Sequence, residues 1–524
     1  MSVNGIGFLI FLAVCLAIYY AAPKKIRWLV LLTASIVFYL SFSVPAFLYL
    51  AVTVVSTYLF SLLLGKLAAI KPFGDTPEQK RSFKKRLTFK KRVVLSFALI
   101  INFATLAVLK YLGFFIANYN SIAEPLGAQT VTAPSLLLPL GISFYIFQTS
   151  GYLIDIYRGK CIPERNIAKY TLFVCYFPQM VQGPINRFKT LGTQLFEGNS
   201  FCLSNLQQGL LRMMMGVLKK ALIADTLAKA VTSIYSDYNS YPGVIVFFGA
   251  MLYCIQLYCD FSGGIDLLNG ASMLFGVKME ENFARPYFAD SLSEFWRRWH
   301  ISLGEWMKDY LFYPIALSKP MGRLTKNARK ILPAGIVKRL TPCIATFVVF
   351  LAVGMWQGPG WANIAYGLWN GFWMSLALMC APLLITAREK FPLKKKTLFF
   401  TVFGILRTNL LVIIGRYFSN SPTLSGALGM LKRTFMHPEF SQVSGDTFIS
   451  LGITPTVAVT VLLSLACLFC ISLAQEKGID VIAWLCERKW YVQFTILFIC
   501  LLIIIIGVYG NSGYTPIAYV YENV

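Results

Sequence analysis

The chain has 524 residues, of which 57% are hydrophobic and only 14% charged, and its mean hydropathy is +0.62. This composition excludes a soluble globular domain and indicates an all-α integral membrane protein. The formal net charge is +25. In a protein this apolar, basic residues gather in short loops and set the orientation of the helices, so we expect no nucleic-acid partner.

Apolar runs recur along the whole chain. A helix needs about 20 residues to cross a hydrocarbon core of ~30 Å, which predicts about 10 to 13 crossings or re-entrant pieces here. We expect them to form one polytopic domain over residues 1–524. The longest runs lie at about 5–22, 28–43, 45–65, 93–118, 135–156, 242–259, 340–356, 361–385, 398–415, 455–474 and 492–510.

Basic loops predict the orientation of these helices. Residues 24–27 follow the first apolar run, and residues 66–92 hold ten Lys or Arg against two acidic residues. Two more basic loops lie at 319–339 and 388–396. All four loops are expected in the cytoplasm, with the N-terminus outside. The first apolar run has no small-residue cleavage site and is followed by further spans, so we interpret it as a retained helix.

The stretch 340–387 between two cytoplasmic loops must cross the membrane and return. Its glycines and proline at 354–361 predict the turning point. Gln357 lies 17 residues after Leu340, or roughly 26 Å at the helical rise of ~1.5 Å, which predicts a position deep in the membrane or near its outer face. His300 precedes a cytoplasmic loop and is expected nearer the inner face. The two positions would then be opposite ends of one polar channel.

The block at residues 294–309 is the most polar interruption of the apolar pattern. It combines three Trp with several charged residues and His300, and the chain has only one other histidine, His437. Ionisable side chains at membrane depth are expensive, so such a block predicts a functional site. The alternative is an interfacial belt, because Trp and Arg also gather at the level of the lipid headgroups.

Two carboxylates, Asp260 and Asp266, lie in a glycine-containing apolar segment. Isolated carboxylates at membrane depth most often pair with a nearby cation. The sequence therefore favours a structural ion pair over a direct catalytic role, with Arg285, Arg297 and Arg298 as the candidate partners.

Residues 177–187 have the pattern of a broken helix, in which Gln179, Gln182 and Arg187 could line a cavity. Irregular backbone at membrane depth is tolerated only inside protein or beside water. Residues 139–148 have a similar pattern. Packing or pairing is the alternative for both segments.

Twelve cysteines are scattered through the chain, mostly in apolar runs. Cys467 and Cys470 have the spacing of a metal-binding pair, but the residues between them are apolar and the segment is typical of a membrane helix. We expect no metal site.

Taken together, the motifs resemble the membrane-bound O-acyltransferase family, and most closely its bacterial alginate and peptidoglycan O-acetyltransferase branch. The resemblance runs along nearly the whole chain, with the family core at about 135–385 and extra helices at both ends. The motifs that carry it are Phe177–Gln179, Gly183–Ile185, Tyr258–Gly263, Glu281–Tyr287, Phe295–Leu303, Asp309–Leu311 and Gly354–Gly358.

The resemblance implies a multi-helix bundle with a central polar funnel, a cytoplasmic acyl donor and an acceptor hydroxyl outside. The family uses two histidines. The first falls on His300 and the second on Gln357, so this chain departs from the family at a catalytic position. A glutamine amide forms hydrogen bonds but takes up no proton. Losing a general base typically costs ~10²- to 10⁴-fold in rate, so the resemblance implies that the chain as written is nearly inactive.

Further expectations follow from the same resemblance. The donor is acetyl-CoA, another acyl-CoA or an acyl carrier protein, and no cofactor stays bound. The partners are membrane lipid, an extracytoplasmic acyltransferase protein and an exported polysaccharide, and the location is the bacterial plasma (inner) membrane. The expected substrate-binding residues are Trp296, Arg297, Arg298 and Trp299 at the donor entrance, together with Asp260, Gln179 and Trp356.

Three alternatives stay open. A D-alanyl transferase of teichoic acid modification shares the core motifs. A non-catalytic scaffold fits the glutamine at position 357. A transporter should show internal repeats with paired broken helices, and the sequence shows none.

Overall fold

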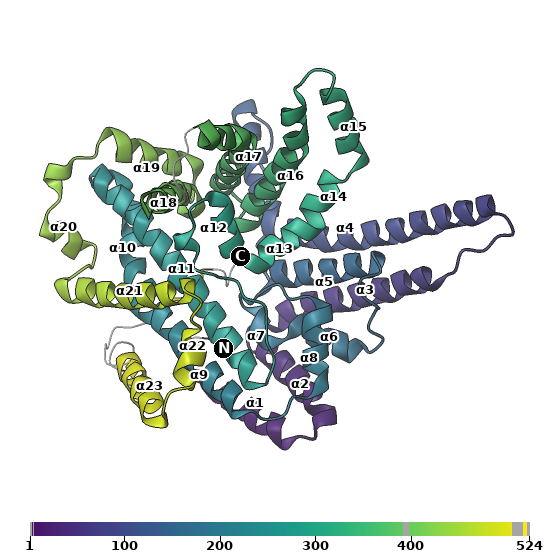
Figure 1. Ribbon diagram of the computed structural model, residues 1–524, viewed down its shortest axis with the longest axis horizontal. Helices are drawn as coiled ribbons and strands as arrows, with labels where there is room; N and C mark the ends of the chain where they lie inside the picture. Colours follow the sequence, from purple (N-terminus) through teal and green to yellow (C-terminus); the bar gives the residue numbers. More distant parts are fainter. Residues whose placement is uncertain (1–2, 4, 391–397, 506–516, 521–524) are drawn as a thin grey trace. The chain divides into compact units, whose positions relative to one another are not determined.

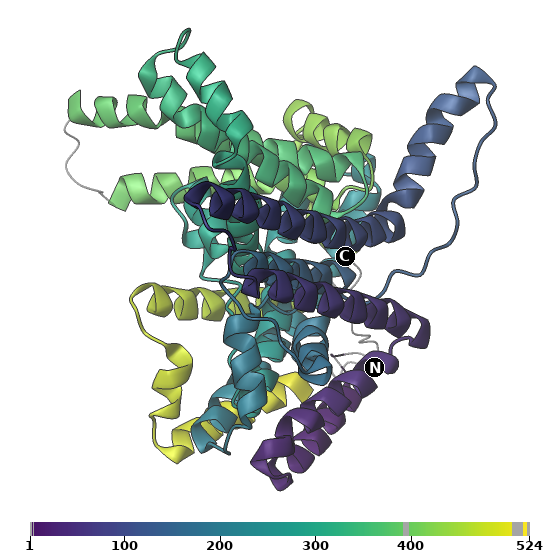
Figure 2. The same cartoon turned by 90° about the vertical axis from the view of Figure 1, so that its right-hand side faces the viewer.

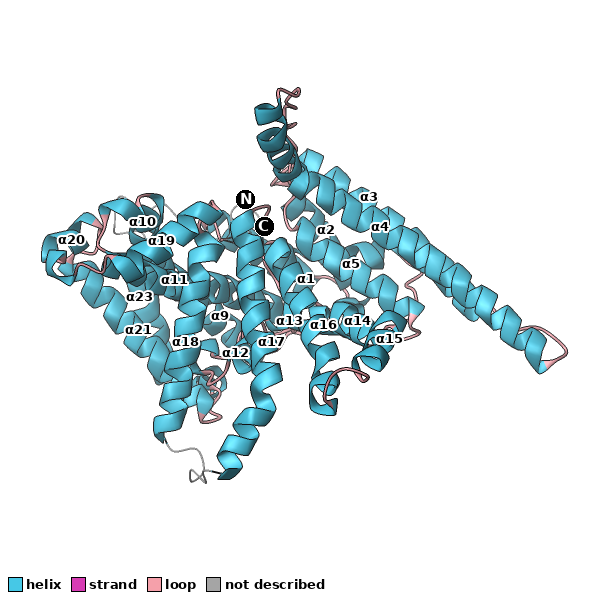
Figure 3. Cartoon of the chain, turned by 90° about the horizontal axis from the view of Figure 1, so that it is seen from above, coloured by secondary structure: helices cyan, strands magenta, loops and turns pink. Residues whose placement is uncertain are grey.

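The computed structural model describes residues 3, 5–390, 398–505 and 517–520. Over these residues the chain consists of helices joined by loops, and none of them forms a β-strand beyond one isolated bridge between Phe283 and Trp299 (Figure 3). The prediction of an all-α protein is confirmed.

Seven of the described helices are long and apolar enough to cross a membrane. Two shorter apolar helices lie at Ile6–Ala21 and Trp490–Ile503. The prediction of a multi-pass membrane protein is therefore confirmed. The seven helices cover Val44–Ala69, Pro77–Leu126, Gly243–Leu274, Ala334–Gln357, Trp361–Ala381, Leu398–Asn420 and Pro455–Glu476.

The chain divides into two compact units. The first contains Met1–Met215, Gly264–Glu280 and Ala518–Val524, and the second contains Gly216–Gly263 and Glu281–Ile517. Two helices, α9 (Leu203–Leu218) and α11 (Gly243–Leu274), pass from one unit into the other. The single domain expected from the sequence stays a prediction, and each unit is described by itself.

The first unit is built from the N-terminal helices. In it α3 and α4 run side by side (Figure 1). After α4 the chain continues through residues 127–141 without a helix, the long blue loop of Figure 2. The helices of this unit are α1 (Ile6–Ala21), α2 (Arg27–Leu40), α3 (Val44–Ala69), α4 (Pro77–Ala123), α5 (Ile142–Tyr157), α6 (Ile167–Cys175), α7 (Phe177–Met180) and α8 (Thr193–Glu197).

Helix α5 forms the core of the first unit. The sequence pattern at 135–156 predicts a membrane crossing, but the structure gives a helix of 16 residues, 13 of which are buried. It packs against α3, α4 and α6. A helix that is buried on almost every side packs against protein and not against lipid. This is one reason why the long spans are fewer than the apolar runs.

The second unit holds the polar block of the sequence. A π-helical segment, Lys219–Ala224, leads into its first helix, and a second one, Lys308–Phe312, joins α13 to α14. Its helices are α10 (Asp225–Ser236), α12 (Leu292–Arg298), α13 (Ile301–Met307), α14 (Tyr313–Ala316), α15 (Lys319–Ala328), α16 (Ala334–Gln357), α17 (Trp361–Lys390), α18 (Leu398–Asn420), α19 (Leu424–Met436), α20 (Gly445–Ser450), α21 (Pro455–Glu476), α22 (Val481–Cys486) and α23 (Trp490–Ile504).

Helices α16 and α17 form the hairpin that the sequence predicts at 354–361. The chain reverses between Gln357 and Trp361. Gly354 and Gly367 face each other where the two helices cross. A Cβ on Gly354 would lie 2.5 Å from the Asn363 carbonyl oxygen and 2.8 Å from the Gly367 Cα. Only glycine lets the two backbones approach this closely.

Candidate active site around His300

His300 lies at the break between α12 and α13. Its backbone is left-handed, with φ 48° and ψ 55°. This conformation is uncommon for residues other than glycine. Such strain persists only where the surrounding structure enforces it, and it gathers at functional sites.

The segment around Asn282 holds His300 from both sides. The Ala284 amide donates to the Arg298 carbonyl at 3.0 Å, and the Ile301 amide donates to the Asn282 carbonyl at 3.1 Å. The Asn282 Oδ1 also accepts a hydrogen bond of 3.1 Å from the Ser302 amide, one of the first amides of α13. An asparagine oxygen that satisfies the start of a helix acts as a cap. Residues 282–284 therefore fix the backbone on both sides of the strained position.

The imidazole of His300 is buried between aromatic rings. The residue is 2% exposed. Its ring lies edge-on to Phe261, with centroids 4.9 Å apart, and to Trp356, at 5.4 Å. Burial lowers the pKa of His300 from 6.5 to about 3, because the charged imidazolium loses its hydration. The ring is therefore neutral at physiological pH.

His300 also lines a cavity of about 560 Å³ in the second unit. One wall comes from α12, α13 and the π-helical segment that follows. The opposite wall is one face of α16, formed by Thr346, Val349, Phe350 and Val353 at helical spacing. Three of the predicted donor-site residues line this cavity as well, namely Trp296, Arg297 and Trp299.

The three predicted cavity residues have different environments. Trp299 is buried and stacks on Phe295. The Trp296 indole Nε1 donates to the Asn370 Oδ1 at 3.2 Å. The Arg297 side chain is 73% exposed and pairs with Glu294 at 3.0 Å. The two tryptophans form the fixed part of the cavity wall, and Arg297 is an accessible cation of this wall.

Arg298 does not contribute to the cavity lining. Its guanidinium pairs with Glu294 at 2.9 Å and with Glu476 of α21 at 2.6 Å. Successive residues of α12 thus serve two purposes, because Arg297 lines the cavity and Arg298 connects the helix to α21.

Gln357 is the last residue of α16 and follows Trp356, whose ring contacts His300. The expectation that the His300 block and position 357 are opposite ends of a channel is therefore wrong, because the structure brings the adjoining residue against His300. The membrane depth of His300 was inferred from its distance in the sequence to the basic loop. This inference is wrong because His300 lies between two short helices of seven residues. Neither is a membrane-crossing helix along which depth can be counted.

The predicted partners of the two carboxylates are also wrong. Asp260 pairs with Lys220 at 2.6 Å, and Lys220 also pairs with Asp225 at 2.8 Å, all three being buried. In the first unit, Asp266 pairs with Arg212 at 3.0 Å. The structural ion pairs themselves were predicted. The partner cations come from α9 and from the π-helical segment after it. Both segments have mixed polarity, so the sequence did not show that they lie beside the two carboxylates.

Gln179 belongs to a polar cluster of the first unit. Its Oε1 accepts hydrogen bonds from Gln148 at 3.2 Å and from Asn186 at 3.1 Å, and its Nε2 donates to the Phe173 carbonyl. Each polar atom of the amide has at least one protein partner. Its role in substrate binding stays a prediction.

Arg416 on α18 was not among the residues predicted from the sequence. The residue is 1% exposed. Its guanidinium carbon lies 4.9 Å from the centre of the Trp299 ring, and its Nη1 donates to the Tyr366 hydroxyl at 3.2 Å. The signal was present, because Arg416 is a cation within a largely apolar helix. Arg416 supports the Trp299 ring from a buried position.

Comparison with known proteins adds independent information. A model of the membrane-bound O-acyltransferase family matches residues 162–327, which include the His300 block. A probable alginate O-acetylase of Azotobacter vinelandii is 32% identical over 367 residues, which are 70% of this chain and 66% of that protein. The corresponding protein of Pseudomonas putida is 33% identical over 70% of this chain and 68% of its own length. The alignments thus span about two thirds of these relatives.

A peptidoglycan O-acetyltransferase of Helicobacter pylori is 30% identical over 297 residues, 52% of each chain. The family resemblance that the motifs predict is therefore confirmed. The chain belongs to the membrane-bound O-acyltransferase family.

Proposed function

We propose that this protein transfers an acetyl group from acetyl-CoA in the cytoplasm to a hydroxyl group outside the plasma (inner) membrane of a bacterium. The acceptor is an exported polysaccharide or a partner protein that completes the transfer. The names of the relatives support this choice, because two are probable alginate O-acetylases and one is a peptidoglycan O-acetyltransferase.

The observation that carries the proposal is the position of His300. A strained, buried histidine on the wall of a cavity of about 560 Å³ combines a reactive group with a space that a substrate can enter. Cavities that hold small molecules and cofactors usually measure ~300–1,000 Å³. An interfacial belt, the alternative from the sequence, would place these rings at headgroup level and would not require a buried imidazole.

The reaction needs one proton to move. The acceptor oxygen attacks the thioester carbonyl carbon, the bond from carbon to sulfur breaks, and the hydroxyl proton ends on the leaving thiolate. A neutral imidazole can accept that proton from the hydroxyl and then donate it to the thiolate. Burial keeps His300 neutral, but its pKa of about 3 also makes it a weak base. A second group that titrates nearer neutral pH would therefore raise the rate.

Two exposed cations line the cavity, and the carboxylate of Glu305, which pairs with Lys308, lines it as well. Arg297 and Lys308 both line it, and their side chains are 73% and 44% exposed. Guanidinium and ammonium groups suit the phosphates of coenzyme A. We assign them to the donor entrance, with Trp296 and Trp299 as the rigid surface against the thioester arm.

Gln357 is the residue of the proposed site that lacks the expected general base. It follows Trp356 at the end of α16, next to the residue that contacts His300. A glutamine there keeps the size of the family's second histidine without its titratable nitrogen. We therefore propose that the chain as written is an impaired acyltransferase.

The test is acetyl transfer from labelled acetyl-CoA in vesicles that contain the purified chain. Gln357→His is expected to raise the rate by ~10²- to 10⁴-fold, the usual contribution of a general base. Gln357→Asn is the matched control, because it changes the same residue without adding a base. Equal, measurable rates for all three proteins would overturn the assignment of position 357. No transfer by any folded version would favour a scaffold, or a D-alanyl donor, which the same assay can offer on its carrier protein.

A further inference from the structure

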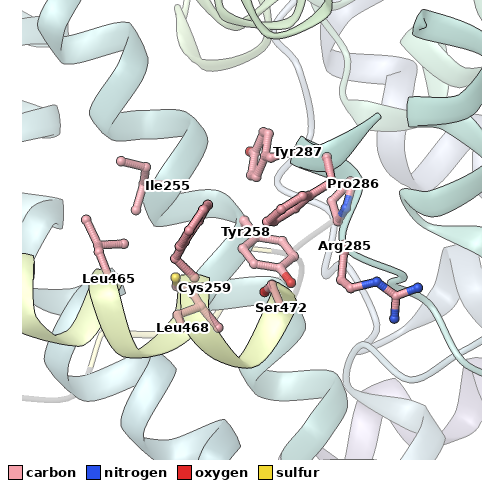
Figure 4. A pocket seen from close by; sticks show the side chains of 11 residues that line it. Ile255, Tyr258, Cys259, Arg285, Pro286, Tyr287, Leu465, Leu468 and Ser472 are labelled. Carbon is pink, nitrogen blue, oxygen red and sulfur yellow. The ribbon is translucent and has the colours of Figure 1, made fainter. Parts of the chain in front are cut away.

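A second, smaller cavity of about 280 Å³ lies along α11 and α21 in the second unit. Figure 4 shows its lining side chains, which are almost all apolar or aromatic. Leu465, Leu468, Phe469 and Ser472 share one face of α21 at helical spacing. Arg285 is the one charged residue in the lining, and its guanidinium points away from the apolar residues (Figure 4).

The cavity is placed where hydrocarbon chains can reach it. Helix α21 is the most apolar of the seven candidate membrane spans, and only 11% of its apolar window is buried inside the protein. Its surface therefore faces lipid in a membrane. Leu465 and Glu476 are 11 residues apart, or about 16 Å at the ~1.5 Å helical rise. That is about half of a hydrocarbon core of ~30 Å, the depth of one leaflet.

A charged cluster lies at the end of the same helix. Glu476, the last residue of α21, pairs with Arg285 at 2.7 Å and with Arg298 at 2.6 Å. Glu294 in turn pairs with Arg297 and Arg298. The cluster thus contains three guanidinium groups and two carboxylates, which leaves one positive charge in excess. Its members are partly exposed, so an anion can approach them.

We infer that this groove binds one membrane phospholipid with an anionic headgroup. One acyl chain lies against the face of α21 from Leu465 to Ser472, and the phosphate lies beside Arg285 and Arg298 at the end of the span. An apolar groove that ends in basic side chains at headgroup level is the arrangement by which membrane proteins select anionic lipids. The inference does not depend on acyl transfer.

The bound lipid contacts residues that pack against Trp299, next to His300. Tyr258 and Tyr287 line the groove, and each ring centroid lies 6.3 Å from that of Trp299, the neighbour of His300 in the chain. One layer of aromatic rings therefore separates the lipid from the candidate active site.

The experiment compares lipid retention in the full chain, purified in detergent with equal amounts of phosphatidylglycerol and phosphatidylcholine. Native mass spectrometry counts the lipids that stay bound. We expect one retained lipid, with phosphatidylglycerol preferred by about fivefold, which is the usual effect of one basic residue near an anionic headgroup. Arg285→Gln should remove most of this preference. Lys330→Gln is the control, because it removes the same charge from an exposed residue outside the groove.

A second pair of variants tests the chain-binding face. Leu468→Trp fills the groove and should abolish retention. Leu463→Trp makes the same change on the same helix at a residue that is 67% exposed and outside the groove, and it should retain the lipid. Thermal unfolding of each variant checks that it is folded. If Leu468→Trp does not fold, Arg285→Gln still tests the site, because this substitution requires no repacking of apolar side chains. Equal retention by Leu468→Trp and Leu463→Trp would overturn the site, as would equal retention of the two lipids by the unchanged chain.

Discussion

Two polar clusters of this protein look alike in the sequence and differ in the structure. Gln179 in the first unit donates or accepts hydrogen bonds with Gln148, Asn186 and Phe173. His300 in the second unit is held by its backbone, and its ring faces other rings and a cavity. The side-chain hydrogen bonds of the first cluster are satisfied within the unit, whereas the second cluster adjoins space for a ligand.

The two clusters differ in what offsets the desolvation free energy of the buried polar group. An amide that finds partners inside the protein stabilises the fold and has little capacity left for a substrate. His300 meets the cost through its neutral form and through a backbone that Asn282 fixes. Catalytic groups are held in this way, by rigid surroundings that leave the reacting atoms accessible.

The largest expected effect comes from His300→Gln. In the Gln357→His background, this change removes the imidazole of His300 from the cavity wall, and acetyl transfer should fall by ~10²- to 10⁴-fold. The rate in reconstituted vesicles measures it, with thermal unfolding as the check on folding. A folded His300→Gln protein with an unchanged rate would show that His300 is structural, like Gln179.

The pH dependence of stability sharpens the comparison, because the cluster around Gln179 contains no titratable group while His300 has a lowered pKa. An unfolded chain takes up a proton on His300 near pH 6.5, whereas the folded chain resists it down to about pH 3. Stability from this group is therefore complete above pH 6.5 and falls as the pH decreases, by about 1.4 kcal/mol per unit.

The measurement compares thermal unfolding of the unchanged chain with that of His300→Phe, at pH 7 and at pH 5. Phenylalanine keeps the aromatic contacts and cannot be protonated. The unchanged chain should lose about 2 kcal/mol more than the variant over this range. If the stability of the two proteins changed equally between pH 7 and pH 5, His300 would not be held neutral by its burial.

Gln179→Leu should act on stability and leave catalysis per folded molecule unchanged. The substitution removes an acceptor that Gln148 and Asn186 share. Each of these donors keeps a backbone carbonyl partner, Phe173 for Gln148 and Pro184 for Asn186. The cost should therefore be about 1–2 kcal/mol, at the low end for a disturbed buried hydrogen bond. A raised KM for the donor with unchanged stability would instead assign Gln179 to substrate binding.

Much of this architecture is predictable from the sequence, and particular residues show why. Long apolar runs predict the membrane helices because the hydrocarbon core sets their length. The glycines at 354–361 predict the hairpin of α16 and α17, since close helices need small residues where they cross. His300 and the tryptophans beside it stand out as polar and aromatic residues in an apolar chain.

The rest depends on contacts between distant segments. The partner of Asp260 is Lys220, 40 residues earlier in the chain, and no local pattern selects it over Arg285 or Arg297. Likewise, Arg416 reaches the Trp299 ring from α18. The sequence shows that a charge must be compensated, but the fold decides which neighbour compensates it.

The smallest expected effect concerns Asn282, which makes the His300 cluster rigid. Its side-chain oxygen caps α13 through the Ser302 amide. Asn282→Ala keeps the backbone bond to Ile301 and removes the cap, which should cost about 1 kcal/mol of stability. The control is Asn102→Ala, which truncates another buried asparagine on α4, far from this cap in the sequence. If the cap holds His300 in its left-handed conformation, Asn282→Ala lowers kcat for acetyl transfer in the Gln357→His background and leaves KM unchanged, while Asn102→Ala changes stability alone. Equal kcat for the two variants would mean that the strained conformation of His300 is held by its ring contacts with Phe261 and Trp356.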